Sequence, residues 1–99
     1  MEISNGSQIM SELSLENRRR RAIFRAEHRG MQVMDIILGR YAKDRVPFMK
    51  EADLAEFEQL MEILDRDLFK WFTGEGPVPD GQNTELFRSI CDFHGIERA

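Results

Sequence analysis

Helix breakers divide this chain into segments whose apolar residues recur every three or four positions. The breakers are Gly30, Pro47, the polar segment 65–67, the loop 74–81 and Gly95. Such spacing places apolar side chains on one face of an α-helix, and no segment shows the alternation expected of a strand. We therefore expect an all-α fold, a compact bundle of five short helices. The expected helices cover residues 14–28, 31–45, 51–64, 66–73 and 83–93.

The length of 99 residues fits a single domain. We expect a flexible N-terminal tail over residues 1–13, a helical domain over 14–95 and a C-terminal tail over 96–99. A domain of this size has few residues with which to fill a core and also wall a deep pocket. Size therefore favours a protein that acts through its surface, and it argues against an enzyme with its own cleft.

Charge is distributed unevenly along a chain whose net charge is −4. Residues 18–29 hold six arginines and one acid, whereas residues 51–67 hold seven acids and one arginine. The four consecutive arginines, Arg18 to Arg21, point to all sides of a helix, and we interpret them as a solvated face. The alternatives are a basic patch for a protein partner and a small nucleic-acid site. The acidic total argues against nucleic-acid binding.

The sequence also bears on the compartment. Cys91 is the only cysteine, which excludes a disulfide within the chain and favours a reducing environment. No segment approaches the ~20 apolar residues of a membrane-spanning helix. The N-terminal segment lacks an apolar signal core and contains Glu2, Glu12 and Glu16, unlike an acid-poor mitochondrial presequence. We expect a cytoplasmic protein that does not insert into a membrane.

Few residues suit metal or nucleophilic chemistry. The two histidines are His28 and His94, and His94 follows Cys91 by three positions. A metal needs three or four convergent ligands and a nucleophile needs a base nearby, so we predict no metal site and no catalytic residue. We expect Cys91 to be a buried thiol and the aromatic cluster around Trp71 to be core. Partial exposure of Trp71 at an interface is the alternative.

Two blocks of the sequence resemble the SdhE family. The first block reads Arg25-x-x-His28-Arg29-Gly30-Met31-x-x-x-Asp35, followed by Leu38-Gly39-Arg40, and the second runs from Leu64 to Trp71. With the Gly-Pro-Val-Pro loop that follows, the resemblance covers about residues 15–93. Members of this family are small bacterial factors that assist covalent attachment of FAD to the flavoprotein subunit of succinate dehydrogenase.

The resemblance implies a five-helix fold and a role as an assembly factor or chaperone rather than an enzyme. Such a factor holds the flavoprotein subunit while FAD attaches autocatalytically to a histidine of that client, so FAD belongs to the client and no cofactor is bound stably here. Fumarate reductase is a second candidate client, and we expect a monomer. An antitoxin-like interaction module is the alternative function.

The family contact motif is Arg-Gly-x-x-Glu. Arg29 and Gly30 match this motif, whereas Val33 stands where the family has glutamate. The resemblance therefore places the partner-binding surface at Arg29, Gly30, His28, Arg25, Met31, Val33 and Asp35. A secondary interface is expected at Asp65, Asp67 and Trp71.

Two expectations concern the local structure at these residues. Gly30 should adopt a left-handed conformation and allow two backbones to approach closely. Asp65 or Asp67 should cap the helix that follows them.

Overall fold

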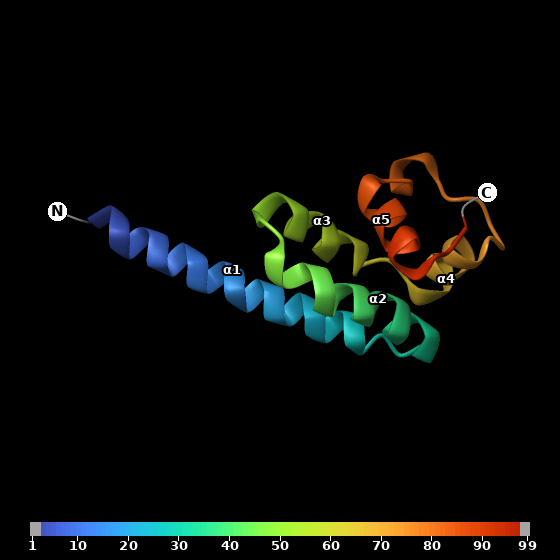
Figure 1. The fold of residues 1–99 in the computed structure, drawn as a ribbon, viewed down its shortest axis with the longest axis horizontal. Helices are drawn as coiled ribbons and strands as arrows, with labels where there is room; N and C mark the ends of the chain where they lie inside the picture. Colours follow the sequence, from blue (N-terminus) through green and yellow to red (C-terminus); the bar gives the residue numbers. More distant parts are fainter. Residues whose placement is uncertain (1–2, 98–99) are drawn as a thin grey trace.

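The computed structural model describes the backbone of residues 3–97 and the side chains from residue 13 onward. The described residues contain five α-helices, two short 3-10 helices and no strand (Figure 1). This confirms the all-α prediction. In chain order these elements are α1 (Ile3–Glu27), α2 (Gln32–Arg45), η1 (Val46–Phe48), α3 (Glu51–Leu60), α4 (Asp65–Thr73), η2 (Asp80–Gln82) and α5 (Glu85–His94).

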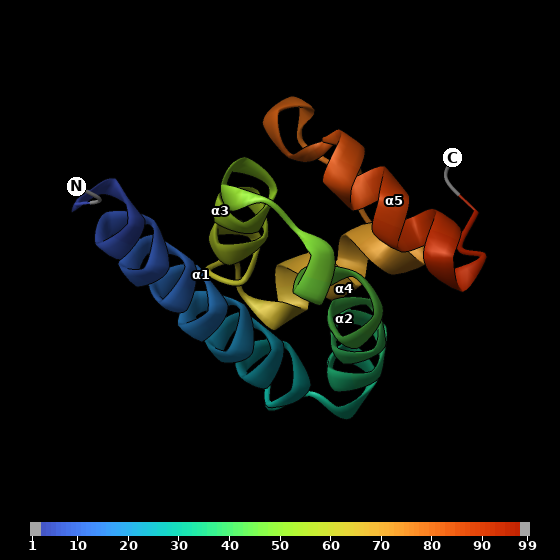
Figure 2. The ribbon, with the colours of Figure 1, turned by 60° about the vertical axis from the view of Figure 1, so that its left-hand side comes forward.

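The first two helices form an antiparallel pair along one side of the bundle (Figure 1). α3 lies beside this pair, and α4 and α5 complete the end of the molecule opposite the N-terminus. The N-terminal half of α1 projects beyond the other elements, so the longest dimension is 57 Å against 25 and 21 Å for the other two. The turn between α1 and α2 lies at the outer edge of the bundle in both views (Figure 2).

The core is formed by the apolar faces that the periodicity predicted. Tyr41 of α2 stacks near Phe57 of α3 and meets the edge of Phe93 of α5, and its hydroxyl lies 2.9 Å from Ser89 Oγ. Phe87 stacks on Phe72 of α4 with ring centroids 4.7 Å apart. The largest fully buried side chains are Phe57, Phe87, Met34, Leu38, Leu54, Leu68, Ile90, Val46 and Cys91.

Most helix ends follow the sequence signals. Thr84 caps α5, with its hydroxyl oxygen accepting a hydrogen bond from the Phe87 N–H at 3.1 Å. α2 ends at Arg45, and Pro47 lies in the 3-10 turn that follows.

Two helix bounds differ from the prediction. α1 begins at Ile3, so the predicted start near residue 14 is wrong. Once the packed part of α1 is formed, adding residues to its N-terminal end costs little, and the one glycine there does not stop the helix. α3 ends at Leu60 instead of residue 64, and Leu64, which lies beyond that end, is 57% exposed.

The predicted tails reach into residues 1–2 and 98–99, which lie outside the described residues. The flexibility of residues 1–13 stays a prediction. Over the described part of the chain, no helix combines the length and apolarity that crossing a membrane requires.

Candidate partner-binding corner

Gly30 sets the turn between α1 and α2, which we call the corner (residues 28–31). Its φ of +97° lies in the region that only glycine enters without strain. A Cβ placed on Gly30 would meet no heavy atom within 4 Å. Glycine is thus required here by the backbone conformation. No second backbone segment of this chain approaches Gly30 closely, so that prediction is wrong within the chain. The space over Gly30 is open to a partner.

The Arg29 side chain turns inward from the corner and is only 8% exposed. Its guanidinium donates hydrogen bonds to the carbonyl oxygens of Met61 and Ile63, both at 2.6 Å. Its Nε also lies 2.7 Å from Asp65 Oδ1. These acceptors belong to the segment 61–65, which we call the joint because it links α3 to α4. Arg29 therefore connects the corner to the joint through hydrogen bonds and an ion pair.

Arg25, one helical turn before Arg29, reaches the same joint from a more exposed position. Its Nη2 lies 2.9 Å from Glu62 Oε2 and 3.4 Å from the Met61 carbonyl oxygen. The Arg25 side chain remains 40% exposed. Arg25 can therefore contact a partner while it supports the joint.

Backbone hydrogen bonds stiffen the other side of the corner. Met31 is extended, and its carbonyl oxygen accepts the N–H groups of Met34 and Asp35 at 2.9 and 3.0 Å. The Asp35 carboxylate in turn accepts the backbone N–H of Arg29. A carboxylate in the first turn of a helix is also favoured by the helix dipole. Asp35 therefore stabilises the backbone of the corner. The position of Asp35 in the sequence motif did not predict this hydrogen bond.

Four large apolar side chains are exposed in the segments that meet at the corner. Phe24 of α1 is 60% exposed, Leu64 of the joint 57%, and Val33 and Ile36 of α2 are 38% and 40% exposed. The Phe24 ring stacks on His28 with centroids 4.1 Å apart, and the His28 Nδ1–H donates to the Phe24 carbonyl oxygen at 2.8 Å. Exposed apolar groups held by a rigid backbone are typical of a surface that binds another protein.

The basic run does not form one open patch. Arg18 pairs with Glu58 and Glu51 of α3, each at 2.8 Å. Arg19 donates to the Met49 carbonyl oxygen at 2.8 and 3.1 Å. Half of the run is therefore used to hold α1 against α3 and the residue Met49 before it, which weakens the interpretations of the run as a solvated face or a nucleic-acid site.

The Arg18 pairing changes the titration of Glu58. Hydrogen bonds from the Arg18 guanidinium hold the pKa of the Glu58 carboxyl below its usual value, and the charges of Arg18, Arg21 and Arg25 act in the same direction. Partial burial of the carboxyl opposes this shift. The same hydrogen bonds raise the pKa of Arg18.

The three residues of the predicted secondary interface all lie on α4, and their contact with a partner stays a prediction. Asp65 is paired with Arg29, and neither Asp65 nor Asp67 caps α4, because Leu64 holds the N-cap position without a side-chain hydrogen bond. The capping prediction is therefore wrong. Trp71 is half-buried at the edge of the core. Its ring packs edge-to-face against Phe87, with centroids 6.4 Å apart.

The other side chains suited to metal or nucleophilic chemistry, His94 and Cys91, have structural roles. His94 donates from Nε2 to the Ile37 carbonyl oxygen at 2.6 Å and thereby ties α5 to α2. Cys91 is 1% exposed, as expected. Among residues 3–97, no group of three or more histidine, cysteine, aspartate or glutamate side chains is placed to hold a metal ion.

The fold and the corner define a class: small helical proteins with a hydrogen-bonded, partly apolar turn at one edge of the bundle. A comparison with known families assigns the chain within this class. The family model described as "Flavinator of succinate dehydrogenase" (Sdh5) matches residues 20–94. This chain belongs to the Sdh5 family.

Individual relatives agree with the family match. The chain is 32% identical over 95 residues to the FAD assembly factor SdhE of Acetobacter pasteurianus, covering 96% of this chain and 87% of that protein. It is 33% identical over 64 residues to the FAD assembly factor SdhE of Pseudomonas aeruginosa, covering 65% of this chain and 76% of that protein. It is 30% identical over 84 residues to the mitochondrial succinate dehydrogenase assembly factor 2 of Candida glabrata, covering 81% of this chain and 55% of that longer protein.

Proposed function

We propose that this protein binds the flavoprotein subunit of succinate dehydrogenase through the corner and promotes covalent attachment of FAD to that subunit. The observation that carries this proposal is the corner itself: Gly30 is open to a partner while Arg29 and Asp35 hold the backbone around it. A surface that is rigid before binding loses little conformational entropy when the complex forms.

Within this proposal, the residues of the corner and their neighbours Arg25 and Val33 have different roles. Arg29 is a positioning residue, because its guanidinium is used by the joint. Gly30, Met31 and Val33 contact the client directly, and His28 and Arg25 border the contact. This division refines the sequence-based hypothesis, in which Arg29 shared the contact centre with Gly30.

The chemistry of attachment belongs to the client. Dinucleotides are commonly held by a strand-turn-helix phosphate cradle, and residues 3–97 contain no strand from which to build one. We therefore assign FAD and the histidine that it modifies to the flavoprotein subunit. This chain contributes binding energy to one conformation of the client and acts as a non-enzymatic monomer in the cytoplasm, with fumarate reductase as a second candidate client.

The direct test is deletion of the gene followed by in-gel flavin fluorescence of the succinate dehydrogenase flavoprotein subunit. We expect the fluorescence to be lost and to return when this chain is expressed from a plasmid. Unchanged fluorescence in the deletion strain, with the subunit present at normal abundance, would contradict the proposal.

A further inference from the structure

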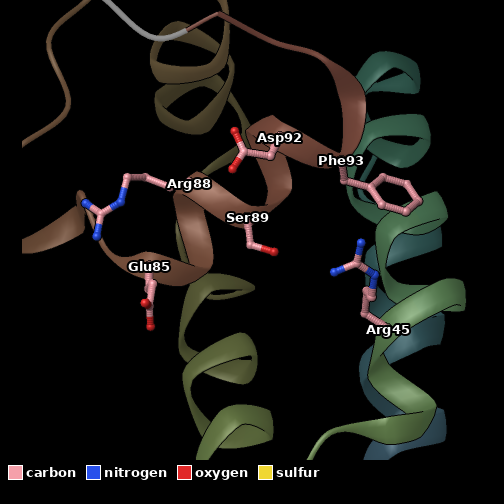
Figure 3. Close-up of a pocket in the computed structure, with 6 residues that line it drawn as sticks. All are labelled: Arg45, Glu85, Arg88, Ser89, Asp92 and Phe93. Atoms are coloured by element: carbon pink, nitrogen blue, oxygen red, sulfur yellow. The ribbon is translucent and has the colours of Figure 1, made fainter.

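A second surface lies at the far end of α2, where two hollows adjoin. One lies between α5 and the end of α2, and the other lies between α5 and the segment from η1 to α3. Both hollows are bordered by Arg45, Glu85 and Ser89, and one of them is shown in Figure 3. Their volumes are about 430 and 410 Å³. α2 has 14 residues, so this groove is roughly 20 Å from the corner.

Aromatic side chains form the apolar part of the groove. Phe48 of η1 is 83% exposed, the highest value among the large apolar side chains exposed in the described residues. Tyr41 and Met49 are buried and line the same hollow, as does Leu86 of α5, which is half-buried. An exposed phenylalanine beside buried apolar groups provides a contact for an apolar side chain from outside.

Carboxylates form the polar rim. Asp53 and Glu56 of α3 and Glu85 of α5 are all exposed and line the same hollow. The one arginine that lines it, Arg45, lies over the rings of Tyr41 and Phe93, with its CZ atom 5.5 and 5.2 Å from their centroids. Its Nε also donates to Asp44 at 2.8 Å. The charge that this hollow offers to a ligand is therefore negative, while Arg88 and Asp92 line the neighbouring hollow.

We propose that this groove binds a basic peptide segment of a partner protein, one in which lysine or arginine residues flank a large apolar side chain. The apolar side chain packs on Phe48, and the cations pair with Asp53, Glu56 and Glu85. Because the groove is distant from the corner, a partner can occupy it while the corner holds a client. This inference is independent of the proposed function.

The test is fluorescence anisotropy of a fluorescein-labelled peptide, Lys-Leu-Lys-Arg-Phe-Lys, titrated with the full chain. The groove variant combines Asp53→Asn, Glu56→Gln and Glu85→Gln. The matched control combines Glu75→Gln, Asp80→Asn and Glu97→Gln, which remove the same charge from exposed positions outside the groove. We expect the groove variant to bind the peptide about tenfold more weakly and the control variant to change binding by less than about threefold.

Phe48→Ser separates docking from general charge attraction. Phe48 is so exposed that its loss should leave the thermal midpoint unchanged, and we expect it to weaken peptide binding by about fivefold or more. Equal losses in the groove and control variants, or no binding to the wild-type chain, would overturn the proposal. A dimer in sedimentation velocity that Phe48→Ser dissociates would also overturn it, since a second copy would then occupy the groove.

Discussion

Arg29 and Asp65 lie 36 positions apart in the sequence, yet their side chains form an ion pair of 2.7 Å with 8% and 17% of each side chain exposed. The same guanidinium also binds two backbone carbonyl groups of the joint. Those carbonyls follow the end of α3, where the backbone has no helical partners left and a cation is favoured. A residue of the family contact motif therefore works mainly inside this protein.

Replacing Arg29 should consequently lower stability as well as function. Arg29→Met leaves the Asp65 carboxylate and two carbonyl groups without their donor, and we expect the free energy of unfolding to fall by about 3 kcal/mol. Asp65→Asn retains both carbonyl contacts and should cost about 1 kcal/mol. Urea unfolding followed by circular dichroism measures both values. Full stability of Arg29→Met together with lost client binding would show that Arg29 contacts the client directly.

Val33→Glu restores the carboxylate that the family motif carries. Val33 is 38% exposed in the first turn of α2, where a negative charge interacts favourably with the helix dipole by roughly 0.3–1 kcal/mol. We expect client binding or flavinylation to increase, measured by titration of the purified flavoprotein subunit. Val33→Gln is the control that adds a polar group without charge. Weaker binding by Val33→Glu would mean that the interface is built around valine.

Leu64 tests whether the apolar side chains near the corner serve binding or the core. Because Leu64 is 57% exposed, Leu64→Ser should change the free energy of unfolding by less than about 0.5 kcal/mol, yet weaken client binding. Leu54→Ala removes a fully buried side chain and should cost about 2–5 kcal/mol. A large loss of stability in Leu64→Ser would show that Leu64 contributes to the core.

The pairing of Glu58 with Arg18 predicts a contribution to stability that depends on pH. Arg18 holds the pKa of Glu58 in the folded chain below its usual value of 4.5. This contribution is therefore complete above about pH 4.5 and is lost as the pH falls through the lower folded value. Glu58→Gln should lower the thermal midpoint at pH 7 and leave it closer to that of the wild-type chain at pH 3. An equal difference at both pH values would contradict this assignment.

Local chemistry explains which parts of the fold were predictable from sequence. Gly30 and Thr84 act through their own backbone or immediate neighbours, so the corner and the start of α5 could be placed in advance. The carbonyl groups that follow the end of α3 are bound by Arg29, which lies more than thirty positions away in the sequence. No glycine or proline marks that end, and the periodic apolar pattern continues through Leu64.

The candidate site was predictable in position but not in the roles of its residues. Motif spacing located Arg29, Gly30 and Asp35 in one stretch of sequence. It did not show that the Arg29 side chain turns inward, since its acceptors lie more than thirty positions away, or that the Asp35 carboxylate accepts the Arg29 N–H. Nor did it show the exposure of Phe24 and Leu64, which depends on how the helices are oriented in the bundle.

The measurement closest to the central claim is binding of the purified flavoprotein subunit to Gly30→Arg, with Gly74→Arg as its matched control. Both glycines have positive φ, and neither has a heavy atom within 4 Å of an added Cβ. Both variants should therefore lose similar stability, about 1–2 kcal/mol, but only Gly30→Arg places a large side chain on the corner. We predict that Gly30→Arg abolishes binding in isothermal titration calorimetry while Gly74→Arg binds as the wild-type chain does. Wild-type affinity in a folded Gly30→Arg variant would contradict the account.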